Sequence, residues 1–155
     1  MRLTRASDYA LRVLIHLAHP EGTGRTTREE IVRNTGAPPA FLNKLIQRLV
    51  RAGFVSSRPG VRGGCVLAVP ADCVSVLQVI ESIDGPLRIS ECVLDATACP
   101  RCSSCKLRRL LSELRDETVR VLSAATVADL ANGDAGAPVS AHVSAKENPC
   151  TLRNI

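Results

Sequence analysis

Four cysteines are gathered in one short segment of this chain, and thiolates at such spacing are able to bind a metal. Cys92, Cys99, Cys102 and Cys105 follow the pattern C-x6-C-x2-C-x2-C. Short spacers bring several soft ligands together at little loop-closure cost. The spacing alone leaves three kinds of site open: a structural zinc site, an iron-sulfur cluster, or a thiol switch without metal.

The composition is that of a globular protein. The chain has 155 residues, of which 45% are apolar and 23% charged, so it is neither wholly disordered nor collagenous. One Tyr and two Phe are its only aromatic residues, which disfavours recognition of single strands by stacked bases. The longest apolar run, residues 10–18, is too short to cross a bilayer. We therefore expect a cytoplasmic protein without membrane contact.

The charge is divided unevenly between the two halves. Residues 1–70 hold 11 Lys and Arg against 4 Asp and Glu, a balance of +7, whereas residues 71–155 hold 9 against 11, a balance of −2. A basic half of this kind suits a polyanionic partner, although a solvated Arg-rich surface gives the same excess.

The basic half carries the pattern of a winged helix-turn-helix. Apolar spacing and capping residues predict helices over 4–19, 27–36 and 38–53, with Thr27 and Glu30 forming a capping box. Residues 54–69 then predict a β-hairpin with arginines at its tip. Two helices joined by a short turn and followed by a hairpin are typical of DNA-binding proteins. A helical pair and hairpin that merely pack a small domain are the alternative.

This arrangement predicts which side chains would contact duplex DNA. The third helix would enter the major groove, where Asn and Gln can bond adenine and Lys can reach guanine. The wing would bring its arginines to phosphates or to the minor groove. The candidate contacts are Thr27, Arg28, Pro39, Ala40, Phe41, Asn43, Lys44, Gln47 and Arg48 on the helices, and Arg58 and Arg62 on the wing.

The second half predicts a helix over 75–85, the cysteine loop, and a long helix from residue 107 to 125. Small or apolar residues recur on that long helix at heptad-like spacing, which favours a dimer seam; they are Leu107, Leu111, Leu114, Thr118, Val121 and Ala125. Thr126 can cap a last short helix. We expect three regions: a DNA-binding domain over 1–70, the loop and dimerisation helix over 71–131, and a disordered tail over 132–155.

Several motifs in order resemble the IscR/NsrR/RirA family of winged-helix regulators. They are Met1-Arg2-Leu3-Thr4 with Tyr9-Ala10, Phe41-Leu42-Asn43-Lys44-Leu45 with Leu49, Gly53-Phe54-Val55 with Ser57, Gly63-Gly64, Val79-Ile80 with Ile83-Asp84-Gly85, and the cysteine loop. The resemblance covers about residues 1–131. It implies a mainly α fold with a small β-hairpin wing, a homodimer that binds operator DNA, and an iron-sulfur cluster held by three cysteines.

The resemblance also implies a ligand set. Cys92, Cys99 and Cys105 match the three cysteine ligands. Cys102 is an additional thiol, and it could replace Cys99, supply a fourth thiolate or be a spare thiol. In this family the fourth ligand can be a carboxylate from the first helix of the partner subunit, and Asp8 stands at that position. An aspartate in the first turn of a helix is also favoured by the helix dipole alone.

The sequence therefore predicts a dimeric transcription regulator controlled by an iron-sulfur cluster. A zinc-dependent or thiol-switch repressor without a cluster is one alternative. An iron-sulfur electron-transfer protein is another, but it has no need of a basic winged-helix half. Hydrolysis and group transfer have no support, because the sequence shows no Ser/His/Asp arrangement and no phosphate loop. We expect that the protein is not an enzyme.

Overall fold

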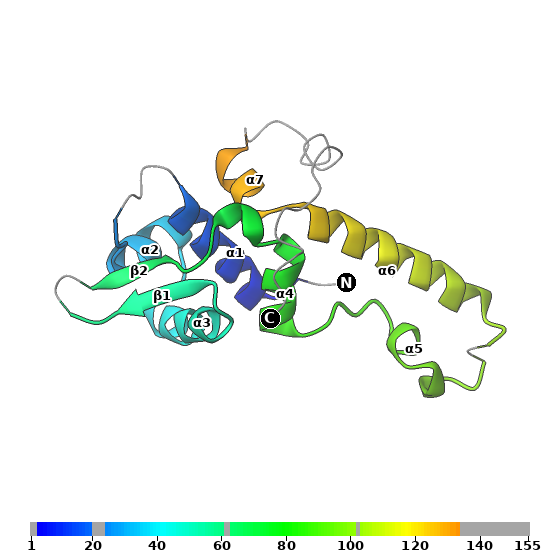
Figure 1. Ribbon diagram of the computed structural model, residues 1–155. Helices are drawn as coiled ribbons and strands as arrows, with labels where there is room; N and C mark the ends of the chain where they lie inside the picture. The colour runs from blue at the N-terminus through cyan, green and yellow to red at the C-terminus, as the bar shows by residue number, and fades with distance from the viewer. Residues whose placement is uncertain (1–2, 20–23, 61–62, 102, 134–155) are drawn as a thin grey trace.

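The computed structural model describes residues 3–19, 24–60, 63–101 and 103–133. The first part of the chain forms three helices and a hairpin: α1 (Arg5–Ala18), α2 (Arg28–Thr35), α3 (Pro39–Arg51), β1 (Val55–Arg58) and β2 (Gly64–Leu67). The two strands are antiparallel and project beside α2 and α3 (Figure 1). The remaining elements are η1 (Ala71–Cys73), α4 (Val76–Asp84), α5 (Glu91–Leu94), η2 (Ala96–Ala98), α6 (Lys106–Ala124) and α7 (Val127–Asn132). The predicted fold class, mainly α with a hairpin wing, is confirmed.

Local capping explains where several helices begin. Thr4 caps α1 by accepting a hydrogen bond from the Ser7 backbone N–H. The capping box of Thr27 and Glu30 opens α2 as predicted, and Ser75 opens α4 in the same way. Gly36 ends α2 with a backbone φ of +70°, a conformation that residues with a Cβ rarely adopt.

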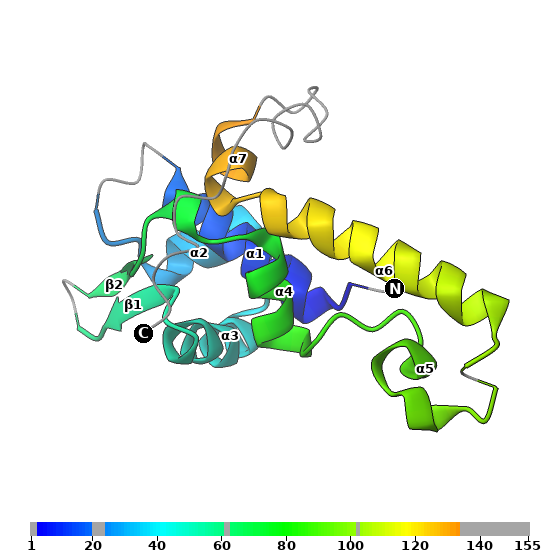
Figure 2. The same cartoon turned by 45° about the vertical axis from the view of Figure 1, so that its right-hand side comes forward.

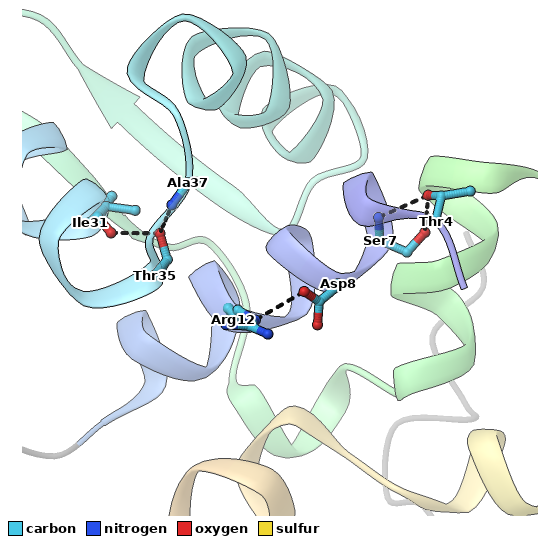
Figure 3. Close-up of polar contacts among 7 residues, drawn as sticks. All are labelled: Thr4, Ser7, Asp8, Arg12, Ile31, Thr35 and Ala37. Atoms are coloured by element: carbon cyan, nitrogen blue, oxygen red, sulfur yellow. Dashed lines mark hydrogen bonds and ion pairs between the residues drawn. The ribbon is translucent and has the colours of Figure 1, made fainter. Parts of the chain in front are cut away.

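The turn between α2 and α3 is held by a buried hydroxyl. Thr35 is 4% exposed; its Oγ1 donates to the Ile31 carbonyl at 2.6 Å and accepts from the Ala37 N–H at 3.3 Å (Figure 3). The hydroxyl thus satisfies backbone groups on both sides of the turn. These bonds set the position of α3 relative to α2.

One aliphatic core joins both halves of the chain. Its fully buried side chains come from α1, α2, α3, α4 and α7, and include Leu14, Ile31, Leu49, Val79 and Val127. α1 and α4 cross at its centre (Figures 1 and 2). The helices beyond residue 70 are therefore packed directly on the helix-turn-helix.

α6 is attached at its C-terminal end and projects away from this core. The Val76 N–H donates to the Ala125 carbonyl at 2.9 Å, and the Val127 N–H donates to the Val74 carbonyl at 2.9 Å. Both views show α6 running outward from this attachment, with the cysteine loop and α5 at its far end (Figure 2).

The structure shows how far each residue of the predicted seam on α6 is exposed, while the seam itself stays a prediction. Ala125 is 5% exposed because it packs on Val76 and Ile80, so it faces the protein's own core. Leu110, which the heptad pattern left out, is 60% exposed. The apolar residues that α6 leaves exposed are Leu107, Leu110, Leu114 and Val121.

Some sequence predictions fall outside the described residues. These are Arg62 at the wing tip, Cys102, and the predicted tail from residue 134 onward. Within the described ranges, no helix combines the length and the apolar character needed to cross a membrane.

Candidate DNA interface and cysteine loop

α3 separates its apolar and polar side chains onto opposite faces. Its buried residues are Leu42, Leu45, Ile46 and Leu49. Its exposed residues include six of the predicted contacts, Pro39, Ala40, Asn43, Lys44, Gln47 and Arg48. The helix is therefore anchored by leucine and isoleucine and presents amide and cationic groups outward.

Two predicted contacts on α3 are engaged within the protein. Phe41 is half-buried, and its ring packs against Tyr9 at a centroid distance of 5.7 Å and an interplanar angle of 57°. The Arg48 guanidinium donates a hydrogen bond to the Ile83 carbonyl at the end of α4. Helical periodicity places Arg48 on the outside, but its partner lies 35 residues away and gives no local signal in the sequence.

The amino end of α2 holds the next two candidates. The Thr27 N–H donates to Glu30 Oε2 at 2.7 Å, and its hydroxyl lies 3.0 Å from the same oxygen. The backbone and side-chain hydrogen bonds from Thr27 lower the pKa of the Glu30 carboxyl below its ordinary value. Thr27 therefore serves the helix cap, while the neighbouring Arg28 side chain is exposed.

Glycine and backbone pairing attach the wing to the segment before α2. Thr26 and Cys65 exchange backbone hydrogen bonds of 3.0 and 2.9 Å. Gly64 has φ +139°, and a Cβ at this position would lie 2.8 Å from the Thr26 carbonyl oxygen. The close approach of the wing therefore requires glycine at 64.

A cleft of about 320 Å³ lies between the amino end of α2 and the wing. Arg28 lines one side, and Ser57 and Arg58 line the other. Arg58 is exposed at the end of β1, where it pairs with Gly64. The cleft is thus bordered by two arginines and by Glu29 at a helix amino end, where arginine side chains can contact phosphate oxygens.

The three cysteines that match the family's ligands lie on one excursion between α4 and α6. Cys92 is in α5, Cys99 follows η2, and Cys105 precedes the first residue of α6. All three are half-buried. The Cys92 sulfur lies 3.2 Å from the Ser90 hydroxyl, and the Cys92 carbonyl accepts a 2.8 Å hydrogen bond from Arg108 Nε. Arg108 thereby joins the beginning of the loop to the first turn of α6.

The donor chemistry fits a soft metal, because three thiols from one loop are the ligands that iron-sulfur clusters and zinc prefer. In the part of the chain that the structure describes, no three His, Cys, Asp or Glu side chains are close enough to hold a metal ion. Asp8 is on α1, where it forms an ion pair with Arg12 at 3.1 Å (Figure 3). Its side chain is 44% exposed, so its outer face is open to solvent.

Comparison with known proteins defines the class to which this fold and loop belong. A family model of iron-dependent transcriptional regulators, Rrf2, matches residues 3–133. The chain belongs to the Rrf2 family of transcriptional regulators.

Particular relatives are informative. The HTH-type transcriptional repressor NsrR of Streptomyces coelicolor is 33% identical over 137 residues, which is 88% of this chain and 92% of the relative. The protein aau3 of Rhizobium meliloti is 33% identical over 131 residues, 84% of each chain. The structure of CymR, the global cysteine regulator of B. subtilis, has a TM-score of 0.67 and 28% identity, covering 84% of this chain and 96% of that one.

Proposed function

We propose that this protein is a homodimeric transcription repressor whose affinity for its operator depends on an iron-sulfur cluster held by Cys92, Cys99 and Cys105. The observation that carries the proposal is the position of these three thiols. Their loop leaves the end of α4 and returns at the start of α6, in a chain that matches a family of iron-dependent regulators. We place the protein in the cytoplasm.

The DNA-binding surface is formed by the polar face of α3 together with the wing. Asn43 and Gln47 are one turn apart and exposed, so both amides can reach base edges in the major groove. Lys44 supplies charge to the same face. Arg28 and Arg58 border the cleft below the wing and are placed to contact phosphates.

The homodimer is formed through α6. The described residues of α6 leave four apolar side chains more than one third exposed, three of them leucines above half. A contiguous apolar stripe of this kind marks an interaction surface. A two-fold pairing of this stripe would bring two recognition helices to one DNA duplex.

When bound, the iron-sulfur cluster would supply the sensing chemistry, because its assembly or loss responds to iron, oxidants or nitric oxide. Cys92, Cys99 and Cys105 hold it through thiolate sulfur. Arg108 keeps Cys92 close to the start of α6 by holding its carbonyl. The Ser90 hydroxyl is placed to donate a hydrogen bond to the Cys92 sulfur.

The fourth ligand in this proposal is Asp8 of the partner subunit, and Cys102 is its rival. A carboxylate is a harder ligand for iron than a thiolate, so a site closed by Asp8 would react faster with nitric oxide. Cluster content and the rate of this reaction are measured in the Asp8→Ala and Cys102→Ala proteins. If only Cys102→Ala loses the cluster, the cross-subunit carboxylate is wrong.

The test of the cluster is its iron and sulfide content. Protein purified without oxygen is expected to be coloured and to contain iron with acid-labile sulfide. Cys92→Ala and Cys105→Ala should each lose iron and sulfide, because either change opens the coordination sphere. Cys65 is buried in the core, so Cys65→Ala is the thiol control and should retain iron and sulfide. Stoichiometric zinc without visible absorption would contradict the proposal.

The test of the DNA surface is binding to a fluorescent duplex selected by the wild-type protein from a random-sequence pool. Lys44→Ala should weaken binding and make its salt dependence shallower, because phosphate contacts release counterions. Asn43→Ala should instead change which duplex is selected. An affinity indifferent to salt and to both changes would contradict the assignment.

A zinc-dependent or thiol-dependent regulator is the second candidate. One observation favours it: the similar solved structure of CymR, with a TM-score of 0.67, is that of a global cysteine regulator. Three thiols and a fourth ligand also satisfy tetrahedral zinc. The metal and sulfide analysis separates this candidate from the iron-sulfur protein.

A further inference from the structure

Contacts from α1 and α3 converge on the end of α4 and its C-cap, residues 83–85, here called the α4 joint. From α1, the Thr4 hydroxyl donates to Asp84 Oδ1 at 2.7 Å, and the Ser7 hydroxyl donates to Asp84 Oδ2. From α3, Arg48 donates to the Ile83 carbonyl. The cysteine loop leaves from the same place, directly after the α4 C-cap Gly85.

The contacts with α1 connect two helix ends of opposite polarity. Thr4 is the N-cap of α1, and Ser7 in its first turn is fully buried (Figure 3). The Asp84 carboxylate therefore lies at the positive end of the α1 dipole. Each of its two oxygens accepts a hydrogen bond from a hydroxyl, and these bonds hold the carboxylate and the end of α4 against α1.

The contact with α3 has a matching logic. The carbonyls in the last turn of a helix have no partner within the helix, and cations there are favoured by the dipole. The Arg48 guanidinium satisfies one of these carbonyls on α4. Arg48 lies one turn beyond Lys44 on the recognition helix, so the position of that helix is tied to the α4 joint.

The beginning of the cysteine loop is fixed to the same helix. Leu87 is 5% exposed, and its N–H donates to Glu81 Oε1 of α4 at 3.2 Å. A movement of the segment that carries Cys92 is therefore opposed first by the Glu81 contact and then by the α4 joint.

We propose that the α4 joint transmits the state of the cysteine loop to the recognition helix, with Arg48 and Asp84 as positioning residues. The sequence alone suggested that Arg48 contacts DNA. In this proposal Arg48 instead acts through the Ile83 carbonyl and does not contact a phosphate. This inference rests on the proposed function for its signal, the state of the loop.

The first experiment compares the affinity of cluster-loaded and cluster-free protein for the selected duplex. In the wild type, allosteric coupling of ordinary size changes affinity by about 5- to 150-fold. Arg48→Met keeps the aliphatic stem but removes the bond to Ile83, and Asp84→Asn weakens the bonds to α1. We expect both to reduce the ratio below about fivefold. Arg51→Met is the matched control, because Arg51 donates its hydrogen bond to the Gln47 carbonyl of its own helix, and it should keep the wild-type ratio.

The salt dependence separates positioning from a phosphate contact. Loss of one phosphate contact lowers the slope of log affinity against log salt by about 0.9. Arg48→Met should leave the slope at the wild-type value, whereas Lys44→Met should reduce it. A shallower slope in Arg48→Met would overturn the proposal. So would a loaded-to-free ratio that is above about fivefold in the wild type and unchanged in both joint variants.

A double-mutant cycle tests the joint without the cluster. Glu81→Ala releases the start of the loop, and we combine it with Arg48→Met in cluster-free protein. If two sites are independent, the fold-changes in DNA affinity of the single variants multiply, to within about twofold, to give that of the double variant. If the two sites are coupled, they do not. Effects that simply multiply would refute the joint. A wild-type ratio of one, together with effects that do not multiply, would refute cluster control and support the joint.

Discussion

The exposed stripe of α6 allows the strength of the proposed dimer to be estimated. Leu110 is 60% exposed in the single chain. Burying a whole leucine side chain contributes about 1.5–3 kcal/mol, so covering this part of it contributes roughly 1–2 kcal/mol. A two-fold interface contains the residue twice, which gives about 2–4 kcal/mol for the dimer.

Leu110→Ala is therefore expected to raise the dimer dissociation constant by roughly 30- to 1,000-fold, since each 1.4 kcal/mol is a factor of ten. Sedimentation velocity over a series of protein concentrations measures this constant. Asp116→Ala is the matched control: Asp116 is exposed on α6 and forms an ion pair with the adjacent Arg115 at 3.3 Å.

Two outcomes would refute this reasoning. If the wild type remains a monomer at every concentration, α6 is not a dimer seam. If the wild type is a dimer but Leu110→Ala dissociates no more readily than Asp116→Ala, the subunits meet on another surface. Unfolding of each variant, followed by circular dichroism, establishes that a change in dissociation is not a loss of structure.

Two further predictions concern the winged helix-turn-helix. Gly64→Ala should lower DNA affinity and Tm, because residue 64 has φ +139° and its Cβ would lie 2.8 Å from the Thr26 carbonyl oxygen. A binding titration and a thermal melt measure these effects. Gly24→Ala is the control, because a Cβ there meets nothing within 4 Å. Glu30→Ala should lower Tm at neutral pH. The folded-state pKa of Glu30 is depressed by its hydrogen bonds from Thr27, so its stabilisation is fully present above the ordinary pKa of glutamate and is lost as the pH falls through the folded-state pKa. Melts of Glu30→Ala and wild type should therefore converge in acid, and a constant difference in Tm would refute the role of the ionised cap.

Features that depend on neighbours in sequence were predictable. The capping boxes at Thr27 and Ser75 mark helix starts because the cap and its partner are three residues apart. The helix-turn-helix and wing follow from local spacing in the same way. That the clustered cysteines bind a metal stays a prediction, which rests on ligand type and spacing along the chain.

Features that depend on tertiary packing were not. The heptad pattern included Ala125 and left out Leu110, because only the position of α4 decides which side of α6 is covered. Periodicity placed Arg48 outside, but it contains no information about the Ile83 carbonyl. The turn hydroxyl of Thr35 was missed for a related reason: a threonine before Gly36 resembles any helix end until its burial is known.

The attachment of α6 at one end has a geometrical consequence for its other end. A helix of 19 residues is about 28 Å long, so a tilt of about 5° at the Ala125 attachment displaces its first turn by about 2.5 Å. Cys105 immediately precedes that turn and would move with it, whereas Leu122 would barely change its neighbours. Structures of the protein with different states of the cysteine loop should therefore superimpose closely over residues 122–133 and diverge steadily towards residue 105. α6 would act as an angular amplifier whose pivot is the pair of backbone hydrogen bonds at Val74 and Val76.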